Sequence, residues 1–153
     1  MKRNVDDQMC PDANAGNRLA SPLDTLLGYR LRRASMTMMN DLMEALRPFN
    51  LSAGEASFLI LIGANPGCRQ SDVGRALEIK RANLTPLVGR MKARGFVVDA
   101  PIDGRSLSLT LTPAGSALQE DVLQRVAASD SSFRDQLALD EKTLLAALAT
   151  ISG

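Results

Sequence analysis

The chain has 153 residues, a formal net charge of +1 and a hydrophobic fraction of 45%, values that suit one folded domain or a domain with a small appended module. No apolar run reaches the roughly 18 residues needed to cross a membrane. The basic N-terminus lacks the apolar segment of a secretory signal, so we expect a cytoplasmic protein.

Residues 1–20 are polar and show no apolar period, which predicts a mobile tail. A long helix is expected to begin at Ser21 or Asp24 and to end near Arg47, because Pro48 disfavours helix in the residue before it. The apolar residues of this helix recur at spacings of three and four: Leu23, Leu27, Leu31, Ala34, Met38, Leu42 and Ala45.

A capping box marks the start of the next helix, since Ser52 can cap it while the Glu55 side chain reaches back to the cap. The helix is expected to stop at Asn65-Pro66-Gly67, a run of residues that breaks helices. Its apolar residues are Ala56, Leu59, Ile60 and Ile62.

Two more helices are expected next, separated by a turn at Glu78–Arg81. Ser71 can cap the first, whose apolar residues are spaced three and four apart. The second ends at Gly95, because glycine commonly follows the last helical turn. Its apolar residues at helical spacing are Leu84, Leu87, Val88 and Met91.

Pro86 constrains where the second of these helices begins, because proline inside a helix removes a hydrogen bond and clashes with the preceding turn. A start near Ala82 or Asn83 places Pro86 in the first turn, where backbone N–H groups have no intrahelical partner. The N-terminal end of a helix is the end that meets bases and phosphates. The residues expected there are Lys80, Arg81, Asn83 and Thr85.

A two-stranded hairpin is predicted after the basic helix. Phe96-Val97-Val98 begins one strand, and Leu107, Leu109 and Leu111 alternate with polar residues in the other. Asp103-Gly104 is a common turn pair for a tight hairpin. Helix, turn, basic helix and hairpin together form a winged helix-turn-helix, which is a DNA-reading unit.

Two C-terminal helices complete the predicted chain. Thr112-Pro113 combines an N-cap with proline at the first helical position, and that helix is expected to extend to about Ser129. Asp140 caps the last helix. The apolar residues of the last helix are Leu144, Leu145, Leu148 and Ile151.

We therefore expect a mainly α fold with a small β-hairpin wing. A DNA-binding domain over residues 49–112 is flanked by dimerisation helices at 21–48 and 113–153. The winged core is too small to cover the apolar faces of these outer helices, so a second copy of the chain is expected to bury them. Two-fold homodimers are the commonest oligomers of this kind.

Positive charge concentrates in the predicted DNA reader. From Pro66 to Thr112 the sequence has eight Lys and Arg residues against four Asp and Glu, whereas from Pro113 onward it has three against six. A charge run alone is typical of any solvated helix face. Combined with the winged motif, it favours a double-stranded DNA operator as partner.

The segment from Leu51 to Leu118 resembles the MarR family of bacterial transcriptional regulators. The stretches that carry the resemblance are LSAGEASFLILI, NPGCRQSDVGRALEI, LTPLVGRMKARGFV and DGRSLSLTLTPAGSAL. The Asp-x-Arg wing followed by LTPAG is the most specific of them. The resemblance implies a homodimeric regulator, usually a repressor, that a small and often aromatic ligand releases from a pseudo-palindromic operator.

The resemblance also implies which residues meet DNA. Arg105 corresponds to the wing arginine that enters the minor groove, with Asp103 as its partner, and Ser71 lies on the preceding helix. The departures from the family pattern, Gly104 in the wing and Gly89 in the helix, leave the operator preference open. On or beside the recognition helix the expected DNA-binding residues are Lys80, Arg81, Asn83, Thr85 and Arg90.

The resemblance implies effector binding between the first long helix, the second helix and the winged domain, where family pockets commonly lie. Arginines can hold a carboxylate or phosphates, and methionines can line an adaptable cavity. The segment LGYRLRRAS is similar to that of members responding to phenolic acids or their CoA thioesters. In the alternative, the methionines belong to the core and the arginines pair with Asp41, Glu44 or the partner subunit. The expected ligand-binding residues are Tyr29, Arg30, Arg33, Met36, Met39 and Phe58.

Other functional classes receive less support. Cys68 or Cys10 suggests a redox-sensing regulator of the same fold, but little nearby charge would lower a thiol pKa. An enzyme is disfavoured because the chain has no histidine, phosphate loop or metal-binding spacing, so no catalytic residue, cofactor or metal is expected. A winged-helix protein-interaction module would lack the basic face over Arg81–Arg94.

Overall fold

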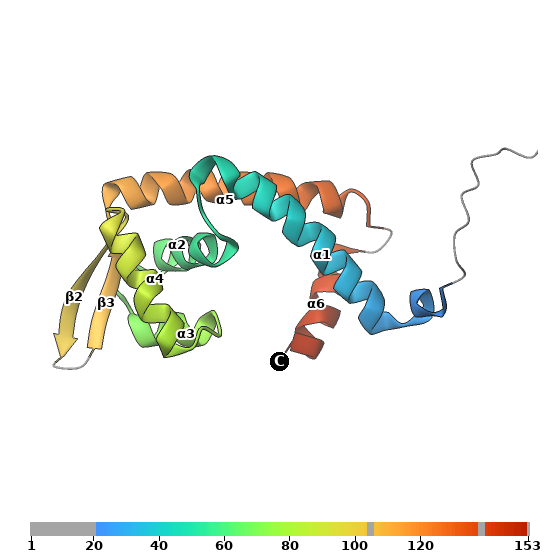
Figure 1. Cartoon of the computed structure of the whole chain (residues 1–153), viewed down its shortest axis with the longest axis horizontal. Helices are drawn as coiled ribbons and strands as arrows, with labels where there is room; N and C mark the ends of the chain where they lie inside the picture. The colour runs from blue at the N-terminus through green and yellow to red at the C-terminus, as the bar shows by residue number, and fades with distance from the viewer. Residues whose placement is uncertain (1–20, 104–105, 138–139, 153) are drawn as a thin grey trace, which may run out of the picture. The chain divides into compact units, whose positions relative to one another are not determined.

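The computed structural model describes residues 21–103, 106–137 and 140–152 (Figure 1). The chain divides into two compact units, Met1–Ala34 and Ser35–Gly153. In chain order the elements are the 3₁₀ turn η1 (Pro22–Thr25), α1 (Leu27–Leu46), the 3₁₀ turn η2 (Arg47–Phe49), α2 (Ala53–Ala64), β1 (Cys68–Arg69), α3 (Gln70–Ala76), α4 (Arg81–Ala93), β2 (Val97–Asp103), β3 (Ser106–Leu111), α5 (Pro113–Arg134) and α6 (Glu141–Ser152). The fold is therefore mainly helical with a small antiparallel sheet, as the sequence predicts.

The hydrophobic core lies in the second unit and centres on α2. Phe58, Leu59 and Ile62 of α2 are fully buried, and α5 packs along this helix (Figure 1). The periodicity predicted for α4 is confirmed, because all four of its apolar positions are buried: Leu84, Leu87, Val88 and Met91.

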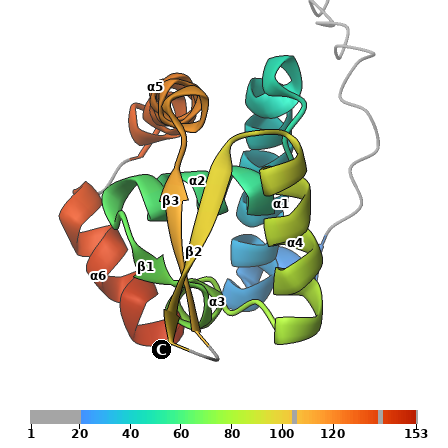
Figure 2. The same cartoon turned by 90° about the vertical axis from the view of Figure 1, so that its left-hand side faces the viewer.

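The wing is a three-stranded sheet, with β3 between β1 and β2 (Figure 2). The predicted hairpin of β2 and β3 is present, and Asp103 pairs with Ser106 where the chain reverses. Gly104, predicted at the turn, lies outside the described residues. The additional strand, β1, pairs Cys68 with Leu109. Its two residues are too few to show the alternation by which a strand is recognised in sequence.

The N-terminal helix begins later than predicted. A 3₁₀ turn over Pro22–Thr25 and an extended Leu26 precede α1, so α1 begins at Leu27 and not at Ser21 or Asp24. The predicted end is confirmed, since α1 stops at Leu46. The tail assigned to residues 1–20 lies outside the described residues.

The first C-terminal helix is longer than predicted. It continues to Arg134, beyond the expected end near Ser129. The polar residues that follow Ser129 are compatible with helix, because the hydroxyl of Ser132 donates to the carbonyl of Ser129 at 2.8 Å. An ion pair between Arg134 and Asp130, at 2.9 Å, supports the last turn.

The start of α5 explains the sequence LTPAG. Thr112 caps the helix, since its Oγ1 accepts from the Gly115 N–H at 3.0 Å and donates to the Gly95 carbonyl at 2.7 Å. A Cβ at Gly115 would lie 2.0 Å from the carbonyl oxygen of Phe96. That oxygen also accepts the Thr112 N–H at 3.0 Å, so the Phe96 backbone cannot move away without losing this bond. Glycine at position 115 therefore allows α5 to pack against the base of the wing.

We expect Gly115→Ala to lower the free energy of unfolding by about 1–3 kcal/mol, the range typical of an overpacked site. Gly54→Ala is the matched control, because a Cβ at Gly54 in α2 would meet nothing within 4 Å. Replacing a helical glycine there should preserve stability or raise it by up to about 1 kcal/mol. Thermal and urea unfolding measure both variants. Equal unfolding midpoints for the two would contradict the tight approach of α5 to Phe96.

Candidate nucleic-acid interface

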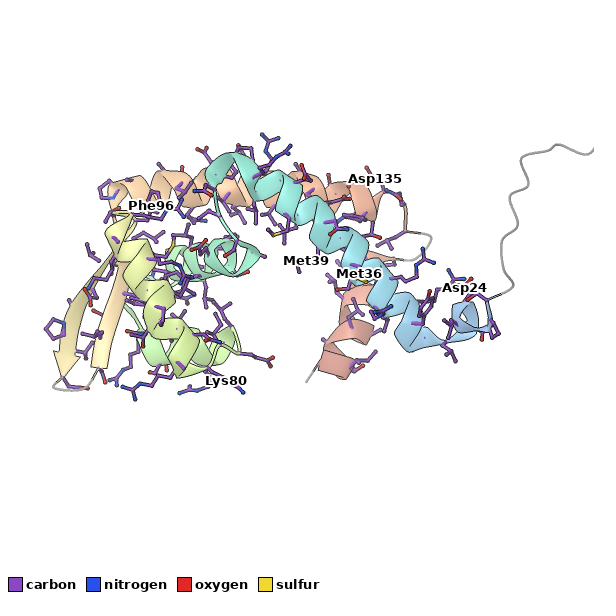
Figure 3. All side chains as sticks on the ribbon, viewed as in Figure 1. Asp24, Met36, Met39, Lys80, Phe96 and Asp135 are labelled. Carbon is purple, nitrogen blue, oxygen red and sulfur yellow. The ribbon has the colours of Figure 1, made fainter. Side chains whose placement is uncertain are left out.

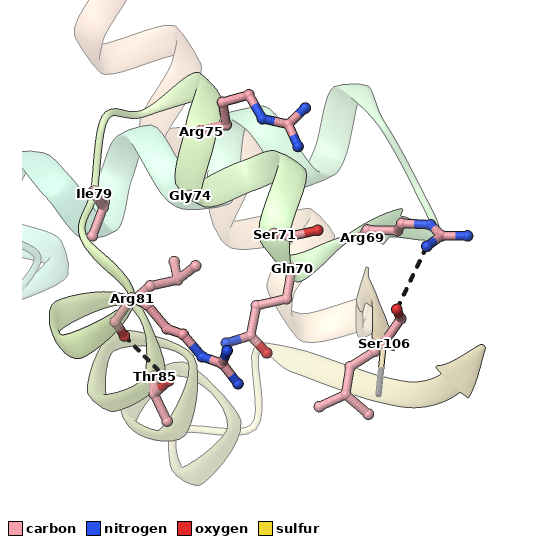
Figure 4. Close-up of a pocket in the computed structure, with 11 residues that line it drawn as sticks. Arg69, Gln70, Ser71, Gly74, Arg75, Ile79, Arg81, Thr85 and Ser106 are labelled. Atoms are coloured by element: carbon pink, nitrogen blue, oxygen red, sulfur yellow. Dashed lines mark hydrogen bonds between the residues drawn. The ribbon is translucent and has the colours of Figure 1, made fainter. Parts of the chain in front are cut away.

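A groove of about 530 Å³ lies between α3, α4 and β3 (Figure 4). Its lining combines polar and basic side chains with apolar ones, among them Ile79 and Leu84. The remaining lining residues come from these three elements and from β1: Arg69, Gln70, Ser71, Gly74, Arg75, Arg81, Thr85, Ser106 and Leu107. The helix-turn-helix and the wing thus share one concave basic surface.

The basic helix α4 begins at Arg81 with Lys80 as its N-cap. The predicted start near Ala82 or Asn83 is therefore slightly late, and Pro86 lies inside the helix. The Asn83 and Leu84 N–H groups already bond to the Lys80 carbonyl, at 2.9 and 3.0 Å, which fixes the earlier start. Pro86 sits one turn later, where its missing N–H leaves a single gap in the helical bonding.

Ser71 does not cap α3 as predicted. The helix begins at Gln70, its N-cap is Arg69, and Ser71 occupies the first turn. The reason is β1, which pairs Arg69 with Ser108 of β3, so the chain leaves the sheet directly into the helix. Ser71 is exposed and lines the groove, and its predicted contact with DNA stays a prediction.

Arg69 joins the groove to the wing, and the sequence reasoning missed it. Its Nη1 lies 3.8 Å from the Asp103 carboxylate at the end of β2 and 3.5 Å from the Ser106 hydroxyl on β3 (Figure 4). Gln70 and Arg75 were missed as well. Only the pairing of β1 with β3 brings this segment beside the wing, and no pattern in the sequence signals so short a strand.

Most cations on or near the groove are paired within the chain. The pairs are Arg69–Asp103, Arg75–Asp72, Arg90–Glu55 and Lys92–Asp99. In the described part of the chain, no carboxylate pairs with Lys80 or Arg81. Lys80 lies at the end of α4 far from Phe96 (Figure 3). The positive charge available to an external anion is thus concentrated at the N-terminus of α4.

Glu55 is the one charged residue buried among the described residues, with 9% of its surface exposed. The predicted capping box is confirmed, since the Ser52 N–H donates to the Glu55 Oε2 at 3.0 Å and the Glu55 N–H donates to the Ser52 Oγ at 3.2 Å. Arg90 Nε donates to the other carboxylate oxygen at 3.2 Å. Burial raises the pKa of Glu55, but the hydrogen bonds from Ser52 and Arg90 outweigh it, so the pKa lies below its ordinary value.

Three of the other residues predicted to meet DNA, Asn83, Thr85 and Asp103, lie among the described residues. Asn83 and Thr85 are exposed on α4, and the Thr85 hydroxyl donates to the Arg81 carbonyl at 3.3 Å. Asp103 ends β2. Arg105 lies outside the described residues.

The residues predicted to bind an effector fall into two groups. Tyr29, Arg30, Arg33, Met36 and Met39 all lie on α1, and Met36 and Met39 are 54% and 46% exposed (Figure 3). Phe58 is fully buried in the core. The structure does not place Phe58 on the exposed surface of α1 with the others.

Two of the arginines of α1, Arg30 and Arg32, have partners other than Asp41 and Glu44. Arg30 pairs with Asp24 at 3.8 Å and donates from Nε to the Asp24 carbonyl at 2.8 Å. Glu44 pairs with Arg47. Arg32 lies over the Tyr29 ring, 5.9 Å from its centroid.

Cys68 is half-buried at the start of β1. Burial raises the pKa of its thiol, a backbone hydrogen bond opposes this rise in part, and the nearby Asp72 adds a smaller increase. A raised pKa disfavours the thiolate that reacts with oxidants.

The described residues offer neither a metal site nor a membrane span. Within the described ranges, no cluster of three or more acidic, cysteine or histidine side chains is arranged to hold a metal ion. No described helix is both long and apolar enough to span a bilayer.

Comparison with known proteins agrees with this geometry. Residues 49–106 match the MarR family. The HTH-type transcriptional regulator PecS of Dickeya dadantii (strain 3937) is 29% identical over 123 residues, which cover 77% of this chain and 74% of the relative.

Two solved structures of the transcriptional repressor CouR share the fold. The first, bound to a 23-mer DNA duplex, aligns with a TM-score of 0.79 and 33% identity over 86% of this chain and 95% of the other. The second, bound to p-coumaroyl-CoA, aligns with a TM-score of 0.76 and 31% identity over 88% and 97%. The similarity thus includes the helices that flank the winged helix-turn-helix.

The low pKa of Glu55 predicts a pH-dependent contribution to stability. A carboxyl whose pKa is lowered by folding stabilises the fold above its unfolded pKa of about 4.3, and this stabilisation is lost as the pH falls through the folded pKa. We expect Glu55→Gln to be less stable than the wild type by about 1–2 kcal/mol at pH 7. The deficit should shrink at about pH 3. Urea unfolding at both pH values tests this prediction. A stability deficit that is the same at both pH values would show that the stabilisation does not depend on ionised Glu55.

Proposed function

The chain belongs to the MarR family of DNA-binding winged helix-turn-helix transcriptional regulators, which are not enzymes, and on this premise we propose a homodimeric repressor that a small aromatic acid or its CoA thioester releases from a pseudo-palindromic operator. The observation that carries the DNA-binding part is the basic groove, with Lys80 and Arg81 at the start of α4, where no described carboxylate pairs with them.

In the proposed complex the N-terminus of α4 enters the major groove of DNA. The helix dipole and free backbone N–H groups at that end favour phosphate. Lys80 and Arg81 supply charge, while Asn83 and Thr85 are exposed beside them and can reach base edges. Arg105 reaches the adjacent minor groove. Phosphate contacts make the affinity strongly salt-dependent.

The proposed dimer buries apolar residues that the single chain leaves exposed. Large side chains exposed on the flanking helices are Met36, Met38, Met39 and Met43 of α1 and Leu145, Leu148 and Ile151 of α6. Exposed apolar surface of this kind marks an interaction site. A two-fold dimer over residues 21–48 and 113–153 would present two recognition helices to half-sites one helical turn apart.

The proposed effector site uses the polar groups of α1. Tyr29, Arg30 and Arg33 offer an aromatic ring and two guanidinium groups that suit a phenolic carboxylate or a phosphate-bearing thioester. The similar repressor CouR has been solved both with DNA and with p-coumaroyl-CoA, which supports this chemical class. Release requires the effector to bind the DNA-free conformation more tightly than the DNA-bound one.

Redox sensing through Cys68 receives no support from its environment. The thiol is half-buried and its pKa is raised. Repression relieved by an effector therefore remains the better account.

We expect Arg105→Ala to weaken operator binding by about 1–3 kcal/mol, because the variant loses the proposed minor-groove contact. Fluorescence anisotropy with the upstream duplex measures the affinity, and size-exclusion chromatography reports whether the dimer persists. Arg125→Ala, which removes an exposed arginine of α5, is the matched control and should bind normally. Unchanged affinity of Arg105→Ala would show that the wing assignment is wrong.

The effector is tested by titrating the protein–operator complex with phenolic acids and with their CoA thioesters. We expect one member of the panel to release the duplex, and Arg30→Ala with Arg33→Ala to need at least about tenfold more of it, as after loss of a charge-assisted contact. The effector should release the duplex without lowering the melting temperature of the protein. Specific DNA binding that is indifferent to the whole panel would contradict the proposed effector class.

A further inference from the structure

We propose that Glu55 is a positioning residue for DNA binding: it fixes the Arg90 guanidinium on α4 so that its terminal amino groups face a DNA phosphate. The inference deepens the proposed function and rests on α4 being the helix that meets DNA. It assigns a role to a buried carboxylate that lies outside the groove.

The Glu55 carboxylate is held rigidly on the side of α2. Its Oε2 accepts from the Ser52 N–H at 3.0 Å and from the Ser52 hydroxyl at 3.1 Å. Its Oε1 accepts from Arg90 Nε at 3.2 Å. Both oxygens are therefore engaged, one by the helix cap and one by Arg90. Because α2 lies at the centre of the hydrophobic core, the hydrogen bond from Arg90 to this carboxylate connects α4 to the core.

Among the described residues, Arg90 is held at only one edge of its guanidinium. The hydrogen bond to Glu55 uses Nε, which leaves the two terminal amino groups for another acceptor. The Arg90 side chain is 58% exposed, whereas that of Glu55 is 12% exposed. The pair thus has a buried end that fixes the geometry and an exposed end that carries the charge to the surface.

Arg90 lies on the same exposed face of α4 as Asn83, which is expected to read bases near the N-terminus of the helix. It follows Asn83 by seven residues and Pro86 by four, and all three residues are exposed. Residues at these spacings share one face of a helix, and seven residues span roughly 10 Å along its axis. A guanidinium there is suited to a backbone phosphate while Asn83 reaches into the groove.

The other ion pairs near this surface are less suited to such a role. The partner of Arg75, Asp72, is 51% exposed and lies on the same helix. The partner of Lys92, Asp99, is 21% exposed and holds a flexible ammonium group. A planar guanidinium fixed by a buried carboxylate loses less rotamer freedom on binding phosphate, which is the benefit of preorganisation.

The direction in which Glu55→Gln changes the affinity for DNA separates this role from its alternatives. Glu55→Gln preserves the shape and an acceptor but removes the negative charge. If Glu55 merely neutralised Arg90, its removal would tighten DNA binding, and if it served only the fold, its removal would change stability alone. Positioning predicts weaker binding by protein that is still folded.

The experiment measures the affinity of the full-length wild type, Glu55→Gln, Arg90→Gln and the double variant for the upstream duplex and for a scrambled duplex. The measurements are made over a range of salt concentrations, at a temperature where thermal melting shows each protein to be folded. Glu44→Gln is the matched control, because it removes an acidic partner from an exposed glutamate–arginine pair with Arg47.

We expect Arg90→Gln to raise Kd about tenfold, with a salt slope lower by about one. Glu55→Gln should raise Kd by a similar factor on both duplexes, because a phosphate contact is independent of sequence. The double variant should be no weaker than Arg90→Gln, which is the signature of a coupled pair. Glu44→Gln should bind like the wild type.

Binding by Glu55→Gln that equals or exceeds that of the wild type would overturn the proposal. Arg90→Lys gives a second test that leaves the cap of α2 intact: it retains the charge but loses the Nε donor, so we expect weaker binding with an unchanged salt slope. Wild-type affinity for Arg90→Lys would also overturn it. Equal wild-type affinity for the two duplexes would instead overturn the proposed function, while the variants would still decide the role of Glu55.

Discussion

The arrangement of the winged domain depends on one buried carboxylate. Glu55 closes the capping box of α2 and accepts a hydrogen bond from Arg90 of α4, so a single side chain marks where the central core helix begins and links α4 to it. A carboxylate this buried is tolerated only because its hydrogen bonds compensate for lost solvation. Phe58, fully buried on the same helix, packs α2 into the hydrophobic core.

The surrounding cations differ in whether an acid of the chain lies close enough to pair with them. Arg75, Arg90 and Lys92 pair with acids of the chain, whereas Lys80 and Arg81 find no acid among the described residues. The unpaired charges lie at the helix N-terminus, where the dipole and free N–H groups already favour an anion. Charge, helix end and groove therefore converge on one location, which explains why a chain with a net charge of only +1 can bind DNA.

Local signals were readable from the sequence, and non-local ones were not. The Ser52–Glu55 capping box, the Thr112 cap and the buried stripe of α4 were predicted correctly because each depends on residues close together in the chain. Sequence reasoning missed β1, the position of Arg69 beside the wing and the partner of Arg90. Each of these depends on pairing between segments about 35 to 40 residues apart. The start of α4 was misplaced because a general rule about proline outweighed the local bonding to Lys80.

The measurement that tests the account most directly is the salt dependence of binding to the upstream duplex, for the wild type and for Arg81→Ala. If the N-terminus of α4 holds a phosphate, the slope of log K against log salt concentration should be lower in the variant by about one, and its affinity should fall on specific and scrambled duplexes alike. The same slope and affinity in both proteins would contradict the placement of the DNA at the basic groove.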